Sequence, residues 1–214
     1  MENPLCPPSD RNFRLIETFG YVPGQGCARL DRHLARMARS AEVLNIPFDV
    51  SEAREVADGL SDDRALRCRM TLDRDGQLDL MTFALGMAPS QAWRLAISPE
   101  RLNSGDLWLS HKTTQRALYD QTRVQLPDGV DEVIFLNERD ELCEGTITNV
   151  FVKTAEGAFV TPPLTSGLLP GILRETELAS GRYAERVVSV QDLQKARNIW
   201  VGNSLRGMIP AMLT

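Results

Sequence analysis

The sequence contains very little lysine and histidine. Of its 24 basic residues only three are lysines, Lys112, Lys153 and Lys195, and it has two histidines. A metal centre built from several histidines is therefore excluded within one chain. The 29 acidic residues bring the net charge to −5, which disfavours a nucleic-acid partner because phosphate neutralisation requires a basic surface. Any covalent chemistry that needs a lysine has three candidate residues.

The sequence also lacks paired cysteines and long apolar runs. Its four cysteines are widely scattered without a C-x-x-C pair, which favours reduced structural thiols over a zinc site or a redox dithiol. No stretch approaches about 18 consecutive apolar residues, and the first residues do not have the pattern of a secretion signal. These absences predict a cytoplasmic protein with no membrane partner and no metal.

The 214 residues are enough to bury a substantial core in one compact unit or two small domains. The alternation of strand and helix patterns predicts a mixed α/β (α+β) fold with two halves. We expect a flexible arm at 1–12, a smaller N-terminal α/β domain at 13–86, an interdomain linker at 87–91 and a larger C-terminal domain at 92–214.

The N-terminal half contains the clearest periodic patterns. Apolar residues three and four apart predict an amphipathic helix over 30–46, and Ser51 is the expected N-cap of a second helix. The alternating runs at 65–73 and 78–85, joined by an Asp-Gly turn, predict a β-hairpin. The first strand is expected at 13–21.

The C-terminal half has shorter patterns. The expected strands are 92–98, two within 131–153, 158–164, 186–190 and 198–204. The expected helices are the later part of 109–126, 172–181 and 191–197. No repeat of 20 to 50 residues is apparent, which disfavours solenoids and propellers.

Lys112 has the most unusual surroundings of the three lysines. A lysine forms an imine with an aldehyde only when its amine is neutral. Lys153 and Lys195 have polar neighbours typical of solvated side chains, whereas Lys112 lies in SHKTTQR, at a junction between a loop and a helix. A special role for Lys112 and an ordinary solvated one both stay open on this pattern alone.

Three other segments combine polar residues with turns. Glu144 follows a strand in ELCEGTITN, and a solvated turn carboxylate is the alternative interpretation. Pro170-Gly171 precedes a helix, whose free N–H groups favour an anion, although this pair is common. Ser204 and Arg206 follow a strand in VGNSLRG, where ordinary loop capping explains them equally well.

Together the four segments resemble one family, the fold-type IV or class IV aminotransferase enzymes, which use pyridoxal 5'-phosphate (PLP). The resemblance rests on HKTT-x-R-x-x-YD, NE-x-x-ELCEGTITN, TPPL-x-SGLLPGILR and NSLRG, in that order, and extends from about Phe13 to Gly207. The residues of these motifs are most similar to those of the aminodeoxychorismate lyase group of the family. The resemblance implies a two-domain fold of the D-amino acid aminotransferase type, with the cofactor between the domains, and a homodimer.

The resemblance also assigns roles to individual residues. It implies that Lys112 binds the cofactor as a Schiff base and moves the proton, and that Glu144 faces the pyridine nitrogen. The other implied cofactor contacts are phosphate ligands and a side chain on the ring face: Arg36 of RHLAR, the backbone of Ile172 and Leu173, the hydroxyl of Ser204, and Leu169 against the ring. Arg67, Arg69 and Arg206 are candidates for a substrate carboxylate.

The implied activity is 4-amino-4-deoxychorismate lyase, which yields 4-aminobenzoate and pyruvate for folate synthesis. A transaminase for branched-chain or D-amino acids is the alternative, and a noncatalytic PLP-binding protein is a third. Two departures from the family bear on this choice. Ala117 stands where branched-chain aminotransferases have a tyrosine, and of the family's N-terminal strands only the FRLIET region is present, so part of the substrate wall is expected to differ.

Overall fold

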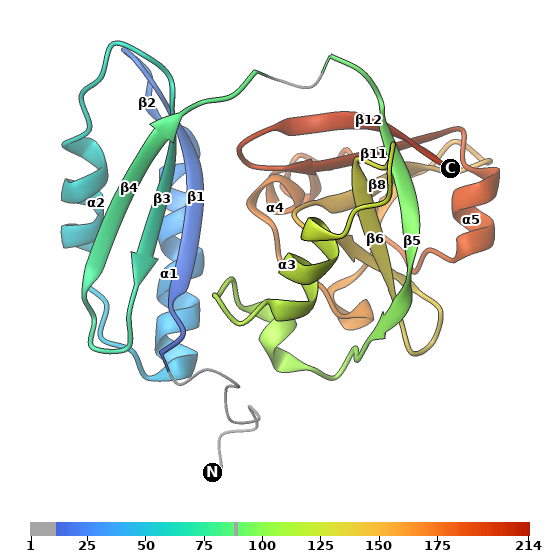
Figure 1. Cartoon of the computed structure of the whole chain (residues 1–214), viewed down its shortest axis with the longest axis horizontal. Coiled ribbons are helices and arrows are strands. Elements are labelled where there is room, and N and C mark those ends of the chain that lie inside the picture. The colour runs from blue at the N-terminus through green and yellow to red at the C-terminus, as the bar shows by residue number, and fades with distance from the viewer. Residues whose placement is uncertain (1–11, 88–89) are drawn as a thin grey trace. The chain divides into compact units, whose positions relative to one another are not determined.

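The computed structural model describes residues 12–87 and 90–214. The predicted arm, apart from its last residue, and the centre of the predicted linker lie outside these residues. The described chain forms two compact units. The N-terminal unit comprises residues 12–87 with His111–Gln115, and the C-terminal unit comprises residues 90–110 with Arg116–Thr214. Both mix helices and strands (Figure 1), which confirms the predicted α/β class.

The N-terminal unit is a four-stranded antiparallel sheet with helices α1 and α2 on one face (Figure 1). The strand order is β2-β1-β3-β4. The elements are β1 (Leu15–Val22), β2 (Gly26–Cys27), α1 (Leu30–Leu44), α2 (Val50–Asp58), β3 (Leu66–Leu72) and β4 (Leu78–Ala84).

The predicted amphipathic helix is confirmed as α1. Its buried positions include Leu30, Leu34, Met37 and Ala41, which are three or four residues apart and so lie on one side of the helix. The helix ends at Leu44 because the next residue is an asparagine in the left-handed conformation, with φ 53°.

The N-cap predicted for the second helix was wrong. The cap of α2 is Asp49, whose carboxylate accepts hydrogen bonds from the backbone N–H groups of Ser51 and Glu52. Ser51 is therefore already inside the first turn. An aspartate two residues earlier reaches the free N–H groups better than Ser51 can, because those groups belong to Ser51 itself and its neighbour.

The predicted hairpin is confirmed as β3 and β4. Leu72 pairs with Leu78, and between them Asp73 Oδ1 accepts hydrogen bonds from the backbone N–H groups of Asp75 and Gln77 at 3.0 and 2.8 Å. Gly76 has φ 86°, a conformation that favours glycine over any residue with a side chain. The local turn residues thus fix the register of the two strands.

The C-terminal unit contains an eight-stranded sheet of order β10-β9-β8-β11-β12-β5-β6-β7. An additional pairing between β8 and β7 closes the strands from β8 to β7 into a ring. The elements are β5 (Trp93–Leu102), α3 (Ala117–Val124), β6 (Glu132–Asn137), β7 (Leu142–Gly145), β8 (Asn149–Lys153), β9 (Phe159–Thr161), α4 (Ile172–Ala179), β10 (Ala184–Glu185), α5 (Val190–Lys195), β11 (Asn198–Asn203) and β12 (Gly207–Leu213).

The strands of this ring bury one aliphatic cluster. Leu95, Ile134, Val150 and Val201, from four different strands, have no exposed surface. Burial of such side chains contributes about 1.5–3 kcal/mol each, so this cluster stabilises the unit. It also gives the polar residues at the strand ends a rigid base.

Two strand predictions in this unit were wrong. Residues 131–153 form three strands, because the chain turns twice, at 138–141 and again at 146–148. Residues 186–190 do not form a strand: Val188 accepts one hydrogen bond from the Leu142 backbone and Ser189 makes a single bridge to Glu141. The short strand β10 lies just before them. Strand β12 was not predicted, and it contains Pro210, which is unusual inside a strand.

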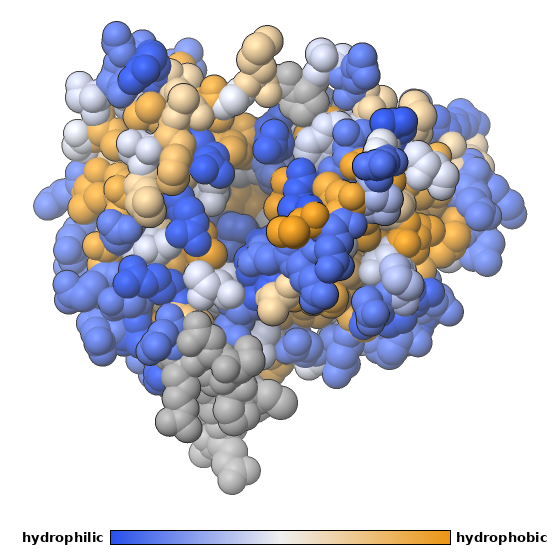
Figure 2. Space-filling model, viewed as in Figure 1, coloured by the Kyte–Doolittle hydropathy of each residue, from blue (hydrophilic) through white to orange (hydrophobic). Residues whose placement is uncertain are grey.

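The face of the molecule in Figure 2 is mostly hydrophilic, with hydrophobic residues in smaller groups between the hydrophilic ones. Within the described residues, no helix has the length and hydrophobicity that crossing a bilayer requires. In the same part of the chain, His, Cys, Asp and Glu side chains form no group of three or more that could hold a metal ion.

Candidate active site

Glu144 lies near the end of β7, and hydrogen bonds fix both oxygens of its carboxylate. The Tyr119 hydroxyl donates to Oε1 at 2.8 Å, and the backbone N–H of Leu169 donates to Oε2 at 3.2 Å. Asn149 Nδ2 is 3.5 Å from Oε2. The carboxylate is 7% exposed, so its direction is set by these partners from α3, β8 and the loop before α4.

Tyr119 acts as a donor to Glu144 over the whole accessible pH range. Burial raises the pKa of its phenol strongly, and the neighbouring charge of Glu144 raises it further. The hydroxyl therefore stays protonated. The sequence analysis did not assign Tyr119 a role, and its position in α3, 25 residues before Glu144, gives no sequence signal of this contact.

The loop from Leu169 to Gly171 is attached to the same cluster. Asn149 Nδ2 donates to the Leu169 carbonyl at 3.0 Å, and the Gly171 N–H donates to that carbonyl at 2.8 Å. A Cβ at Gly171 would overlap Asn149 Oδ1, so only glycine allows this approach. The backbone that leads into α4 is thereby held next to Glu144.

Helix α4 begins at Ile172, as predicted. Its N-cap is Gly171, and no side chain caps the helix. The N–H groups of Ile172 and Leu173 therefore belong to a first turn whose dipole favours an anion. The structure thus brings Glu144, Leu169 and the predicted pair Ile172 and Leu173 together in one unit.

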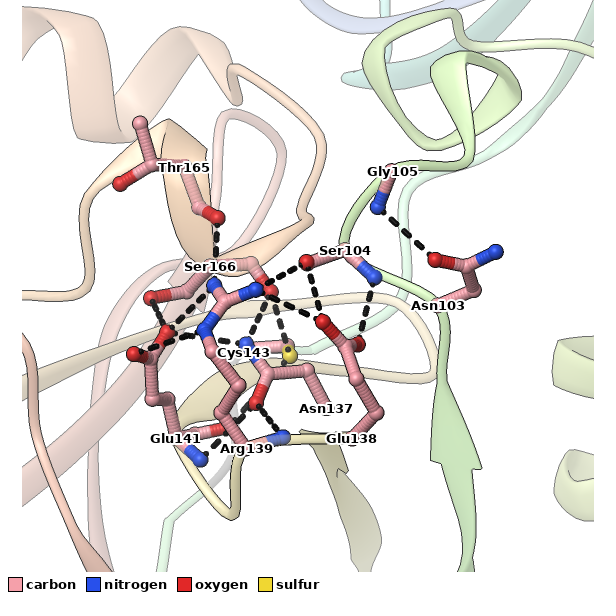
Figure 3. A network of polar contacts seen from close by, with 10 residues as sticks. All are labelled: Asn103, Ser104, Gly105, Asn137, Glu138, Arg139, Glu141, Cys143, Thr165 and Ser166. Carbon is pink, nitrogen blue, oxygen red and sulfur yellow. Dashed lines mark hydrogen bonds and ion pairs between the residues drawn. The ribbon is translucent and has the colours of Figure 1, made fainter.

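A polar network fixes the segment that precedes this loop (Figure 3). Arg139, in the β6–β7 turn, donates to Glu141 Oε2 at 2.8 Å and to the Thr165 carbonyl at 2.9 Å, and it also contacts Ser104 Oγ. Asn137 Nδ2 donates to Glu141 Oε2 and to the Ser166 carbonyl, each at 2.9 Å. Three loops of the C-terminal unit are thereby linked.

The hydrogen bonds of this network keep its carboxylates ionised. Donation from Arg139, followed by that from Asn137 and Ser166, lowers the pKa of Glu141 to about 2. Burial raises the pKa of the adjacent Cys143 thiol to about 12, and the charge of Glu144 contributes to this rise. Cys143 is therefore a protonated structural thiol, which agrees with the prediction that the cysteines are reduced and structural.

Ser204 and Arg206 lie in the turn between β11 and β12. Asn203 Oδ1 accepts hydrogen bonds from the Leu205 and Arg206 backbone N–H groups, at 3.1 and 2.9 Å, which sets the shape of this turn. The Arg206 guanidinium is 5.7 Å from the centre of the Trp93 ring. This cation–π contact occupies one face of a side chain that was predicted to bind substrate.

The N-terminal unit holds Arg36 in a buried ion-pair cluster. Its guanidinium donates to both oxygens of Glu17, at 2.8 and 2.7 Å, and His33 Nδ1 lies 2.6 Å from Glu17 Oε2. Glu17 and His33 are each 1% exposed and Arg36 is 4% exposed. The predicted phosphate ligand is thus oriented by a carboxylate of β1 through a bidentate pair.

This cluster makes the N-terminal unit sensitive to acid. Burial alone would raise the pKa of Glu17, but the charge of Arg36 and the hydrogen bonds from His33 and Arg36 lower it to about 2, from an ordinary 4.5. Because the folded-state pKa is lowered, the ionised Glu17 stabilises the protein above pH 4.5, and this stabilisation is lost as the pH falls toward 2.

Glu17→Gln should therefore reduce the free energy of unfolding at pH 7 by about 3 kcal/mol, measured by urea denaturation.

The matched control is Asp31→Asn on α1, the helix that carries Arg36. Its ion pair with Arg54 is exposed, so we expect a change within about 0.5 kcal/mol. The difference between wild type and Glu17→Gln should shrink from pH 5 to pH 2. A difference that stays constant over this range would contradict the role of the Glu17 charge.

Arg67 and Arg69 project from the same face of β3, as their spacing predicted. Cys68 and Met70, their alternate neighbours, are fully buried. The Arg67 guanidinium is 4.5 Å from the centre of the Phe83 ring on the adjacent strand. Arg67 is exposed and Arg69 is half-buried, so both side chains lie on the sheet face opposite the buried residues.

The backbone around Lys112 is attached to β1. The Lys112 carbonyl accepts a hydrogen bond from the Ile16 N–H at 2.8 Å, and Thr113 forms an antiparallel bridge with Leu15. Thr114 Oγ1 accepts from the Arg14 N–H at 2.9 Å. The segment His111–Gln115 thus belongs to the N-terminal unit, although the sequence boundary had assigned it to the C-terminal domain.

Several residues that hold the site were missed by sequence reasoning. Glu17 had a detectable signal: it occupies an inward position of a strand whose alternate residues Leu15 and Phe19 are apolar. A charge at such a position requires a buried partner. Asn149 was part of the ELCEGTITN motif but was given no role of its own. Glu132, a buried carboxylate of β6, had no comparable signal, because most of its partners come from another segment.

In the C-terminal unit a buried carboxylate lies beside a helix N-terminus that no side chain caps, an arrangement that suits the class of PLP enzymes. The family model of amino-transferase class IV matches residues 14–212, and the chain belongs to this family. Class IV aminotransferases use PLP, which confirms the predicted cofactor and the prediction of an enzyme.

The relatives carry names from two reaction types. A solved structure from Mesorhizobium loti, provisionally named an amino-acid aminotransferase, is 43% identical, has a TM-score of 0.88, and its match covers 94% of this chain and all of that one. A branched-chain-amino-acid aminotransferase of Thermotoga maritima, also named provisionally, is 28% identical, covering 84% of this chain and 69% of the relative. The aminodeoxychorismate lyase of Saccharomyces cerevisiae is 30% identical, covering 55% of this chain and 36% of the lyase.

The C-terminal unit fits the chemistry of PLP. The cofactor has a basic ring nitrogen, for which an ionisable carboxylate such as Glu144 is a suitable partner. Its phosphate suits a helix N-terminus that no side chain caps, and Gly171 lets the backbone approach closely there. The donor set of the described residues therefore matches both ends of the cofactor.

Proposed function

We propose that this protein is a PLP-dependent 4-amino-4-deoxychorismate lyase, which forms 4-aminobenzoate and pyruvate for folate synthesis in the cytoplasm. The observation that carries the PLP assignment is the Glu144 carboxylate, fixed by Tyr119 and the Leu169 N–H beside the start of α4. The lyase assignment is supported by the residue identities of the motifs around Lys112 and Glu144. It is also supported by Ala117 at the position of the branched-chain enzymes' tyrosine.

Glu144 and Lys112 have complementary tasks in this proposal. PLP, when bound, withdraws electrons from the substrate carbon that carries the amine. Glu144 stabilises the protonated ring nitrogen, and this electron withdrawal requires the nitrogen to be protonated. Lys112 would hold the cofactor, release it to the substrate amine, and then take the proton from the substrate carbon. Lys112 would return this proton to the departing enolpyruvate, so that pyruvate leaves as the remaining ring becomes aromatic.

The phosphate is held by groups with full or partial positive charge or with a hydroxyl. The Ile172 and Leu173 N–H groups provide the helix-terminus contact, Ser204 provides a hydroxyl, and Arg36 provides a guanidinium. Glu17 neutralises part of the Arg36 charge and fixes its plane. Leu169 is the aliphatic residue against the ring face.

The substrate carries carboxylates, which calls for arginine partners. Arg67 and Arg69 on β3 and Arg206 after β11 are the candidates. The Phe83 and Trp93 contacts of Arg67 and Arg206 orient these two guanidiniums without neutralising their charge. We also propose a homodimer, as the family resemblance implies.

The direct test is turnover of 4-amino-4-deoxychorismate by the purified, PLP-loaded protein. We expect stoichiometric 4-aminobenzoate and pyruvate, each measured by chromatography. A protein that retains bound cofactor and forms neither product would contradict the lyase assignment.

A transaminase for branched-chain or D-amino acids is the second candidate, favoured by the extent of the match to the Thermotoga maritima relative. This activity would convert the bound cofactor to its amine form on addition of a simple amino acid, and a keto acid would restore it. A folded protein without any borohydride-reducible lysine adduct would instead indicate the third candidate, noncatalytic binding.

A further inference from the structure

Glu132 is a buried carboxylate outside the predicted site, at the first position of β6. It is fully buried, and six hydrogen bonds converge on it. Its side chain accepts from groups of the turn that follows Glu144: the Thr146 N–H at 3.1 Å, the Thr146 hydroxyl at 2.5 Å, the Ile147 N–H at 3.2 Å and the Thr148 hydroxyl at 3.0 Å. The Val133 N–H and the Arg123 guanidinium complete the set.

This arrangement suits a carboxylate, because hydrogen-bond donors reach both of its oxygens. All the groups that face it are donors, and Arg123, whose Nη1 lies 3.4 Å from Oε1, supplies the positive charge. A carboxylate is the side chain that accepts on both oxygens and donates nothing. An amide at this position would direct its own N–H groups at donors, which leaves buried polar groups unsatisfied.

The turn that Glu132 fixes lies between two residues of the candidate site. Glu144 lies opposite Asn149 in the antiparallel pairing of β7 with β8. The Gly145 N–H donates to the Thr148 carbonyl at 2.7 Å, which closes the turn. A Cβ at Gly145 would lie 2.9 Å from Glu132 Cδ, so the glycine allows the carboxylate to pack directly against the turn.

The same turn is connected to the phosphate side of the candidate site. Asn203 Nδ2 donates to the Ile147 carbonyl at 3.1 Å, and Asn203 Oδ1 shapes the turn that contains Ser204. On the other side, Arg116 Nη2 donates to the Thr146 carbonyl at 2.8 Å. The peptide groups of Thr146 and Ile147 are therefore fixed at both their N–H and their carbonyl ends.

We infer that Glu132 is a positioning residue that sets two parts of the cofactor site at once, the Glu144 carboxylate through the β7–β8 turn and the Ser204 turn through Asn203. The inference rests on the proposed function for the meaning of these two parts. Glu132 does not touch the cofactor in this scheme. Its effect is transmitted through backbone groups whose positions it determines.

The test compares Glu132→Gln with wild type in two measurements. Without cofactor, hydrogen–deuterium exchange of the Ile147 amide should be at least about tenfold faster in the variant, because its acceptor is weakened. The Thr146 N–H is shared between Glu132 and the Val133 carbonyl, so its exchange should become faster to a smaller extent. With cofactor, the affinity for PLP should fall at least about tenfold, and the pH at which the visible band of the bound cofactor titrates should shift, because Glu144 is displaced from the ring nitrogen.

The matched control is Asp192→Asn. Asp192 also accepts hydrogen bonds from a backbone N–H and a hydroxyl, both of Ser189, and pairs with Arg186, but at the start of α5. We expect no change in exchange at Thr146 and Ile147 or in the cofactor band. If Glu132→Gln does not fold, Thr148→Val removes one donor at 3.0 Å and should change both measurements in the same direction to a smaller extent.

Unchanged amide exchange and an unchanged cofactor band in Glu132→Gln would overturn the inference. Faster exchange with an unchanged band would also overturn it, because Glu132 would then stabilise the turn without positioning Glu144. Failure of the proposed function is distinguishable, since it would appear as a missing lysine adduct in wild type. In that case faster exchange without cofactor would still support control of the turn by Glu132.

Discussion

Lys112→Ala should lose the covalent cofactor adduct and at least about 10³-fold in turnover. The proposed role of Lys112 combines covalent binding with proton transfer, and alanine can do neither. Borohydride reduction followed by mass spectrometry of peptides should find the adduct on Lys112 in wild type and find none in the variant. Non-covalent PLP should still bind, because the phosphate ligands are unchanged.

The scarcity of lysine makes this experiment unusually clear. Lys195→Ala is the matched control, because Lys195 is exposed at the end of α5, and it should retain both the adduct and the turnover. Lys153, whose amine lies 5.1 Å from the centre of the Phe159 ring, is the remaining lysine. An adduct on Lys153 or Lys195 in wild type would contradict the assignment of Lys112.

Glu144→Gln should lower kcat about 10²- to 10³-fold while changing PLP affinity much less. Glutamine keeps the shape, but its single carbonyl oxygen can accept from only one of Tyr119 and the Leu169 N–H, and it has no charge to stabilise the protonated ring nitrogen. The lost interaction therefore acts mainly in the transition state. Stopped-flow and steady-state kinetics would separate kcat from KM, and titration with PLP would measure affinity.

Glu156→Gln provides the comparison for a carboxylate outside the site. Glu156 is exposed in the turn after β8, so its charge should have no effect on kcat. A Glu144→Gln variant with wild-type kcat would show that Glu144 does not serve the ring nitrogen. Loss of PLP affinity in the same proportion as kcat would show that its role is to form the site rather than to act in the reaction.

Local patterns were sufficient for the parts of the fold that local interactions determine. Helix α1 and the β3–β4 hairpin agree with prediction because the spacing of apolar residues and the Asp73–Gly76 turn act within a few residues. The segment 186–190 had the composition of a strand, yet it makes only isolated backbone contacts, at Arg186, Val188 and Ser189, and no continuous ladder. Whether such a segment forms a strand depends on pairing with a strand that is distant in the sequence, and its composition does not specify that partner.

The candidate site divides in the same way. Motifs in the sequence predicted roles for Lys112 and Glu144 and correctly predicted the start of α4 at Ile172, because their residue types and spacing are characteristic of the family. The partners that hold these groups were not predicted. Tyr119 is 25 residues from Glu144, and Glu132 accepts hydrogen bonds from residues 14 to 16 positions away.

The sequence by itself determined the family, the cofactor and which lysine and carboxylate to test. These follow from residue identities at fixed spacing, and in a chain with three lysines they leave little choice. Only the tertiary structure decided that Glu17 orients Arg36, that Tyr119 and Leu169 orient Glu144, and that Glu132 supports the turn between β7 and β8. Buried charges and carbonyls must be satisfied by whichever groups the fold brings near them, and that proximity arises between elements far apart along the chain.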